Sequence, residues 1–161
     1  MKADLRKEHQ WLQRLVGEWV FEPEPVGPDG TGEGMAGSES VRMLGEAWAI
    51  CEMQVGTPGE DEGRNIMTLG FDPEKDQFVG TFVSSMMTNL WVYQGELDES
   101  GTSLLLDTEG PSFTSEGVKS RYRDRIELVH QDERVLSSSV LDPDGQWREF
   151  MRMRYRRTPL P

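Results

Sequence analysis

Cysteine and histidine are scarce in this chain: 161 residues contain one cysteine, Cys51, and two histidines, His9 and His130. A single cysteine forms no intrachain disulfide, so a reducing cytoplasm is the expected compartment. Nothing near Cys51 marks an activated thiolate, and we expect a small buried side chain there. Apolar runs are short too: none approaches the ~20 residues that span a membrane. Residues 1–8 lack the apolar core of a secretory signal, so the expected protein is cytoplasmic and has no membrane partner.

Positive charge is also in short supply, with 17 Lys and Arg against 29 Asp and Glu and a net charge of −12. Because the phosphates of a nucleic acid demand a basic footprint, we expect no nucleic-acid partner. The basic residues concentrate late in the chain: residues 118–161 carry a balance of +3 and residues 1–117 one of −15. They alternate with other residues, which favours a solvated outer face; an anion site is the alternative.

What the chain does have is alternation of apolar and polar residues, interrupted by turn residues. The stretch 118–130 shows it best, because its even-numbered residues, such as Tyr122 and Ile126, share one face. The other face is mostly basic and would lie toward water: Lys119, Arg121, Arg123 and Arg125. The alternation predicts ten strands near 17–22, 36–45, 47–55, 63–71, 77–84, 89–97, 102–109, 118–130, 134–142 and 147–156.

One helix is expected before the strands. Asp4 can cap it, and it would run over about residues 4–16. Leu5, Leu12 and Val16 share one apolar stripe, with Leu5 and Val16 at its ends, and Gly17 is placed to end the helix.

The connections predict a barrel with two different ends. If the strands run up and down, the turns after even-numbered strands share one end, and all of these are short. The connections after odd-numbered strands are mostly longer and rich in Gly and Pro, as in 22–34 and 110–117. We therefore expect a floor of tight turns capped by the helix and a mouth of longer loops, in an all-β, closed, antiparallel, up-and-down barrel that forms one domain over residues 1–161.

Gly17-Glu18-Trp19 opens the first expected strand. A Gly-x-Trp at this place resembles the start of the lipocalin-like barrels of the calycin superfamily, in which the Trp closes the floor. The resemblance implies that a late arginine, Arg154 or Arg156, covers Trp19 from outside.

Further stretches, taken in order, resemble an uncharacterised bacterial family, domain of unknown function 1579. They include His9-Gln10-Trp11-Leu12, Leu69-Gly70-Phe71-Asp72, Phe82-Val83-Ser84-Ser85-Met86, Leu90 to Asp98, Tyr122-Arg123-Asp124 and Arg154-Tyr155-Arg156-Arg157. The resemblance spans nearly the whole chain and implies a lipocalin-like barrel. It brings no established activity and no catalytic residues.

Residues for metal or cofactor chemistry are few. His9 and His130 both fall at the floor end, but no His, Cys and Asp cluster with ligand spacing accompanies them. Haem would need an axial histidine from the late strands, and residues 147–157 contain none. We expect no metal, no cofactor and no catalytic residue, since phosphate loops and nucleophile elbows are also missing.

Two carboxylates are predicted to face the barrel interior. Asp124 shares the face of Tyr122, and Glu149 shares that of Met151 and Met153. Burial in an apolar cavity would raise the pKa of either group and suit it to acid or base catalysis. The alternative is that each carboxylate binds a neighbouring hydroxyl or arginine, as buried acids usually do.

The favoured hypothesis is a barrel that binds a small apolar molecule without changing it. Met86 and Met87 fall in a mouth loop, where adaptable apolar side chains suit ligand contact. The other expected contacts are Trp91 and Tyr93 below that loop, with Asp124 and Glu149 and, deeper, Tyr122, Met151 and Met153.

The alternatives are an enzyme that uses Asp124 or Glu149, and an interaction module or homodimer sealed by the methionine pair. An apolar cavity without convergent acids favours the carrier, and an acid beside a Tyr or Arg deep in the cavity favours the enzyme. A cavity filled by its own side chains favours the interaction module.

Overall fold

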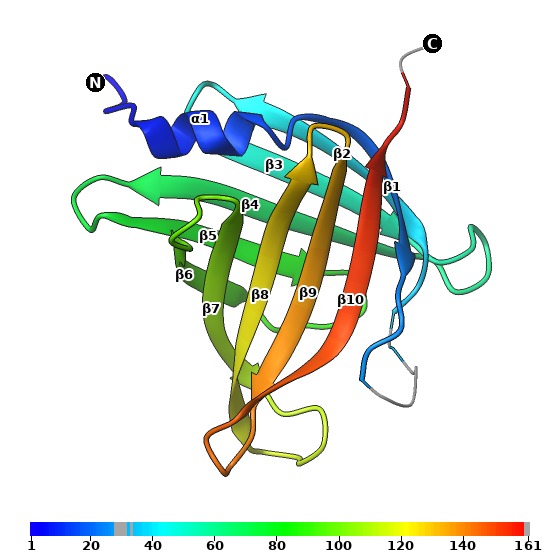
Figure 1. The fold of residues 1–161 in the computed structure, drawn as a ribbon. Coiled ribbons are helices and arrows are strands. Elements are labelled where there is room, and N and C mark those ends of the chain that lie inside the picture. Colours follow the sequence, from blue (N-terminus) through cyan, green and yellow to red (C-terminus); the bar gives the residue numbers. More distant parts are fainter. Residues whose placement is uncertain (28–31, 33, 160–161) are drawn as a thin grey trace.

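The computed structural model describes residues 1–27, 32 and 34–159, which form a closed barrel of ten antiparallel strands and one short helix (Figure 1). The elements are α1 (Lys7–Gln13), β1 (Gly17–Pro23), β2 (Gly37–Leu44), β3 (Trp48–Val55), β4 (Gly63–Asp72), β5 (Gln77–Ser84), β6 (Trp91–Leu97), β7 (Ser103–Pro111), β8 (Lys119–His130), β9 (Glu133–Leu141) and β10 (Trp147–Arg157). Consecutive strands pair, and β1 closes the barrel against β10. The predicted up-and-down barrel is confirmed, with strand ends within two residues of those expected.

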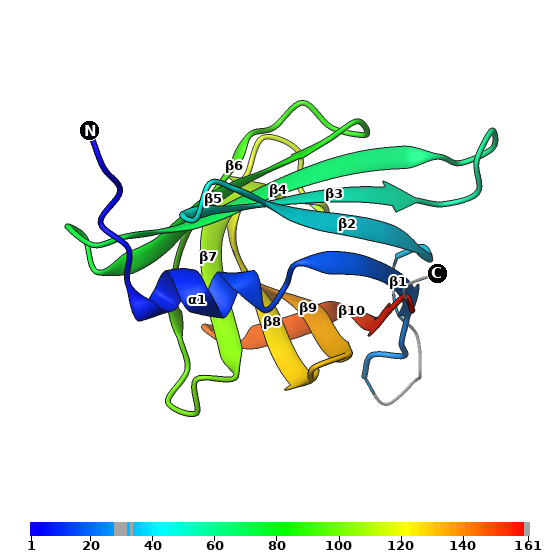
Figure 2. The ribbon, with the colours of Figure 1, turned by 90° about the horizontal axis from the view of Figure 1, so that it is seen from above.

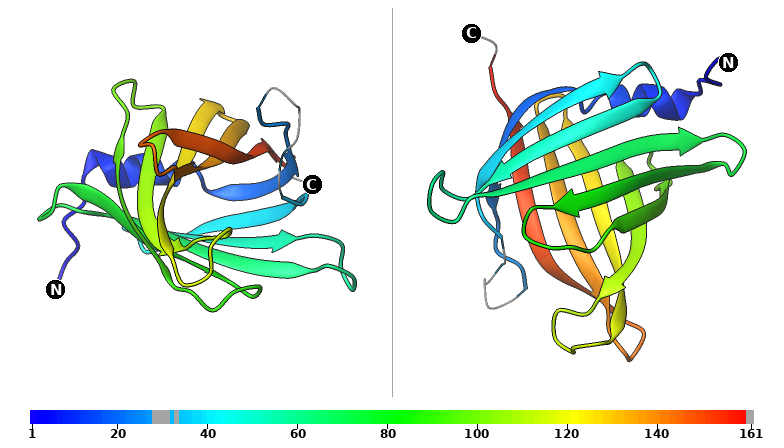
Figure 3. Two further views of the ribbon diagram at one scale, coloured as in Figure 1. Left: turned by 90° about the horizontal axis from the view of Figure 1, so that it is seen from below. Right: turned by 180° about the vertical axis from the view of Figure 1, so that it is seen from behind.

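The two ends of the barrel differ as predicted. Short turns at 45–47, 73–76, 98–102 and 131–132 share one end, and the longer loops 56–62, 85–90 and 112–118 lie at the opposite end with the shorter turn 142–146. The indole nitrogen of Trp11 in α1 donates a hydrogen bond of 2.9 Å to the carbonyl of Gly101 in the β6–β7 turn. Helix α1 therefore lies at the floor (Figure 2), while the β7–β8 and β9–β10 loops extend from the other end (Figure 3). The expected loop 22–34 lies partly outside the described residues.

The helix is shorter than the sequence predicted. It begins after Arg6, whose backbone N–H donates to Nδ1 of His9 at 2.8 Å, and Asp4 instead pairs with the Arg6 side chain in solvent. Leu5 and Val16, the expected ends of the apolar stripe, are exposed. Leu12 and His9 of the expected stripe are buried, and with Trp11 and Leu15 they pack on the barrel floor.

Trp19 closes the floor, but a different arginine covers it. The Trp19 side chain is buried, and its Nε1 donates 2.9 Å to the carbonyl of Leu15. The guanidinium of Arg157 lies 4.2 Å from the centre of a Trp19 ring. The prediction of Arg154 or Arg156 is therefore wrong.

The pairing of β1 with β10 explains the correction. Trp19 stands directly opposite Arg157, and directly opposed residues of an antiparallel pair point to the same face. Arg154 is paired with Glu24 and Glu133, and Arg156 with Glu22.

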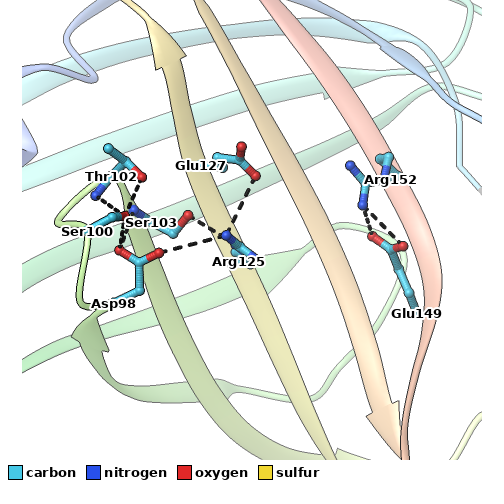
Figure 4. A network of polar contacts seen from close by, with 8 residues as sticks. All are labelled: Asp98, Ser100, Thr102, Ser103, Arg125, Glu127, Glu149 and Arg152. Carbon is cyan, nitrogen blue, oxygen red and sulfur yellow. Dashed lines mark hydrogen bonds and ion pairs between the residues drawn. The ribbon is translucent and has the colours of Figure 1, made fainter.

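The basic face of β8 points outward, as predicted. Arg121 and Arg125 are exposed, whereas Tyr122 and Ile126 are buried. Arg125 lies 3.8 Å from carboxylate oxygens of Asp98 and Glu127 (Figure 4), and Arg123 pairs with Asp107 at 2.7 Å. These acidic partners support the solvated face over the anion site.

Candidate functional site

The barrel encloses a cavity of about 350 Å³. Strands from all around the barrel contribute to its lining, because alternate residues of every strand point inward. Residues of the mouth loops complete the lining. Most of the lining side chains are methionines or aromatic residues: Met35, Met53, Met67, Met86, Met87, Met151, Met153, Phe21, Phe82, Trp91, Tyr93, Phe113, Tyr122, Phe150 and Tyr155. The chain thus forms an apolar container.

Nearly all of the residues proposed from the sequence line this cavity. Met86 and Met87 lie in the β5–β6 loop at its rim, with 54% and 37% of their surface exposed. The remaining members point inward from three strands: Trp91 and Tyr93 of β6, Tyr122 and Asp124 of β8, and Met151 and Met153 of β10. The structure therefore brings these separate sequence segments together around one space.

An aromatic cluster forms the wall below the mouth. The rings of Trp91 and Tyr122 meet edge to face at 5.4 Å, and Phe113 and Phe150 pack against Tyr122 at 5.5 and 6.2 Å. The Trp91 indole nitrogen lies 3.4 Å from the Met87 sulfur. Sequence reasoning missed Phe113 because it sits in a loop without alternation, and Phe150 because its strand is irregular.

The inward placement predicted for Glu149 is wrong. The pairing of β10 with β9 shifts register between Glu149 and Met151, which is a β-bulge. A bulge adds one residue and so changes the face on which preceding side chains lie. Phe150 consequently lines the cavity, whereas Glu149 pairs with Arg152 at 2.9 Å (Figure 4).

Asp124 does face the cavity. Its Oδ2 accepts a 2.5 Å hydrogen bond from the Tyr93 hydroxyl, and its Oδ1 accepts one of 2.6 Å from Ser138. Burial raises the pKa of the Asp124 carboxyl, and these two hydrogen bonds oppose the rise because they stabilise the ionised form. Burial and the nearby carboxylate also raise the pKa of Tyr93 well above its usual range, so its hydroxyl stays a donor.

Below the cavity lies a buried ion pair that the sequence did not reveal. The guanidinium of Arg134 on β9 pairs with the Glu39 carboxylate on β2, and both side chains are almost fully buried. It also lies 4.0 Å from the ring centre of Tyr155 and 4.7 Å from that of Trp19. Burial raises the pKa of Glu39, and Arg134 opposes this rise.

The outward placement of Arg134 within the basic set is therefore wrong. Arg134 has the same parity along β9 as Leu136 and Ser138, which line the cavity. That parity indicated an inward side chain. Because arginine is mostly exposed in proteins, however, Arg134 was expected on the solvated outer face.

His9 and Cys51, the remaining candidates, lie in surroundings that fit a structural role. Both ring nitrogens of His9 have partners, Nδ1 with the Arg6 N–H and Nε2 with the Phe71 carbonyl at 3.1 Å. Cys51 is buried, and burial raises the pKa of its thiol. Within the described ranges, no group of three or more His, Cys, Asp and Glu side chains is placed to hold a metal ion. In that same part of the chain, every helix is too short or too polar to cross a membrane.

Comparison with known proteins gives a family and a fold. The profile of a family described as "Protein of unknown function (DUF1579)" matches residues 4–157. No curated protein matches the sequence. The structure is similar to that of the S-type phycobiliprotein lyase CPES from Guillardia theta, with a TM-score of 0.59, 14% identity, and coverage of 98% of this chain and 96% of the lyase. It is also similar to Rv2717c from M. tuberculosis, with a TM-score of 0.56, 14% identity, and coverage of 97% and 100%.

Proposed function

We propose that this chain, which belongs to the family described as "Protein of unknown function (DUF1579)", binds a small, largely apolar molecule in its barrel without changing it chemically. One observation carries the proposal: a cavity of about 350 Å³, lined mainly by methionine and aromatic side chains, with Met86 and Met87 at its rim. Pockets of this size and character are typical of small-molecule sites. Methionine adapts its shape to a ligand, while aromatic rings provide large apolar contact surfaces.

The alternatives fit the interior less well. An interaction module would have its interior filled by side chains, and this barrel keeps an open space. The enzyme alternative has Asp124 beside Tyr93 in its favour. Among the described residues that line the cavity, however, no second carboxylate converges on Asp124, whose two oxygens already accept hydroxyl hydrogens. The carrier is therefore the function that the geometry supports best.

A fluorescent dye tests the proposal. Nile red, which is neutral and brightens on leaving water, should bind with micromolar affinity. Replacing Trp91 with Ala removes part of the wall below the mouth and should weaken the binding about tenfold, or ~1.4 kcal/mol. Trp48→Ala is the matched control, because Trp48 is 40% exposed and lies outside the cavity lining.

The test can also fail in an informative way. If Nile red does not bind, or binds unchanged after Trp91→Ala and Met86→Gln, the carrier proposal is wrong for this mouth. The methionine pair would then be better explained as a subunit contact. In that case Met87→Glu should convert an oligomer to a monomer in sedimentation.

A further inference from the structure

We propose that the molecule bound in this cavity is an organic cation, with an apolar body and one positively charged nitrogen that binds the Asp124 carboxylate. This inference rests on the proposed function and specifies the class of its ligand. The juxtaposition that carries it is a lone carboxylate inside a cavity of aromatic and methionine side chains.

The charge of the lining is one-sided. Of the described residues around the cavity, Asp124 alone carries a carboxylate, and none is basic. The nearest buried guanidinium, Arg134, is already paired with Glu39 beneath the cavity. An ionised carboxylate in an apolar space is costly unless it is paired, and here the protein supplies hydroxyl donors but no counter-charge. A cationic ligand would supply it.

The surroundings of Asp124 leave room for such a partner. A carboxylate offers about four lone-pair sites, and the hydroxyls of Tyr93 and Ser138 occupy one on each oxygen. Both neighbours donate, so they orient the carboxylate as an acceptor. Two further polar atoms of the lining, Oδ1 of Asn65 and Oγ1 of Thr108, are buried without a hydrogen-bond partner among the described residues. The amide oxygen of Asn65 is a second acceptor for a ligand N–H group.

The aromatic wall suits the same ligand. Aromatic faces attract ammonium groups, and cages of such rings are how proteins recognise quaternary ammonium compounds. Trp91, Tyr93 and Tyr122 all line the space that Asp124 faces. The net charge of the whole chain favours a cationic ligand over an anionic one, because a charge of −12 attracts cations toward the mouth and repels anions.

The preference should depend on pH through Asp124. The titratable groups facing it are the Tyr93 hydroxyl from β6 and Tyr155 from β10, with the Arg134–Glu39 pair below. Burial raises the pKa of both tyrosines well above the usual range, so they stay neutral near pH 7. Cation binding should therefore strengthen as pH rises through the raised pKa of Asp124 and then level off.

Three ligands that share one alkyl chain test the inference by calorimetry: octylammonium, which carries both the charge and N–H donors, neutral 1-octanol and octyl sulfate. In the wild-type protein the ammonium compound should bind at least about tenfold tighter than 1-octanol, or ~1.4 kcal/mol, and the sulfate should not bind. In Asp124→Asn this preference should disappear while 1-octanol affinity stays the same. Asp107→Asn is the matched control. Asp107 lies on β7 and pairs with Arg123 on the outer face of β8, so this variant should keep the preference for the ammonium compound.

The outcomes separate this inference from the proposed function. If 1-octanol binds and the ammonium compound binds no tighter, or if Asp124→Asn keeps the preference, the cation inference is overturned while the carrier stands. If none of the three binds, the proposed function itself is wrong. Should Asp124→Asn fail to fold, acidification of the wild type decides: loss of the preference, with unchanged 1-octanol affinity, supports Asp124, and its retention contradicts it.

Discussion

Trp19 joins the floor of the barrel to three separate parts of the chain. Its indole nitrogen binds the Leu15 carbonyl after α1, and it contacts the guanidinium groups of Arg134 from β9 and Arg157 from β10. A side chain with this many buried contacts fixes how the helix, the first strand and the last strands meet.

Replacing Trp19 with Ala should therefore lower the free energy of unfolding by about 3–5 kcal/mol, because it removes a large buried ring and leaves a cavity. Urea denaturation followed by circular dichroism measures the loss. Trp48→Ala is the control, with a smaller loss expected at its 40% exposed ring. A loss below about 1 kcal/mol at Trp19 would contradict its role as the floor plug.

The sequence predicted some of these residues and missed others. Trp19 could be identified because its Gly-x-Trp motif is local. Arg157 could not, because Trp19 faces it only through the register of β1 against β10. The parity of Arg134 along β9 pointed inward, but its partner Glu39 comes from β2 and is set by barrel closure. Asp124 was placed inward by alternation, but its partner Ser138 depends on the register of β8 against β9.

Strand β8 shows how one element separates a water side from an interior side. Arg121 is exposed, and Ile126 is 2% exposed in the core. Replacing Arg121 with Gln should change the stability by only about 0.5 kcal/mol, since it removes little buried contact. Ile126→Ala on the same strand should cost about 2–5 kcal/mol.

Chemical denaturation of both variants measures this difference. Equal losses would show that the two faces of β8 are not distinguished and that its register is wrong, because a slip of one residue exchanges them.

Alternation succeeded along β8 and, in β10, failed for Glu149 before the bulge, for a physical reason. Around its cavity-facing residues, β8 pairs regularly with β9. Strand β10 contains a bulge between Glu149 and Met151, which the local sequence pattern does not predict. The predicted ends of α1 were also wrong, because the helix spans only Lys7–Gln13. Asp4 is a good capping residue, yet contact with the barrel selects the turn that buries His9 and Leu12.

For the whole molecule, the fold followed from sequence because ten alternating stretches and unequal connections agree on one topology. The cavity did not follow. Whether a barrel interior is filled depends on the summed volumes of inward side chains from all strands. Its charge balance also depended on the outward turn of Glu149, which left Asp124 as the one carboxylate among the described lining residues.

Native mass spectrometry of the protein purified from its own host, before and after denaturing extraction, shows whether the barrel holds a ligand. We expect a native species heavier than the chain, and the extra mass should be released on denaturation as a small apolar molecule. A basic nitrogen in that molecule would match the Asp124 carboxylate. A native mass equal to that of the bare chain, unchanged by extraction and by added Nile red, would contradict a ligand-binding barrel.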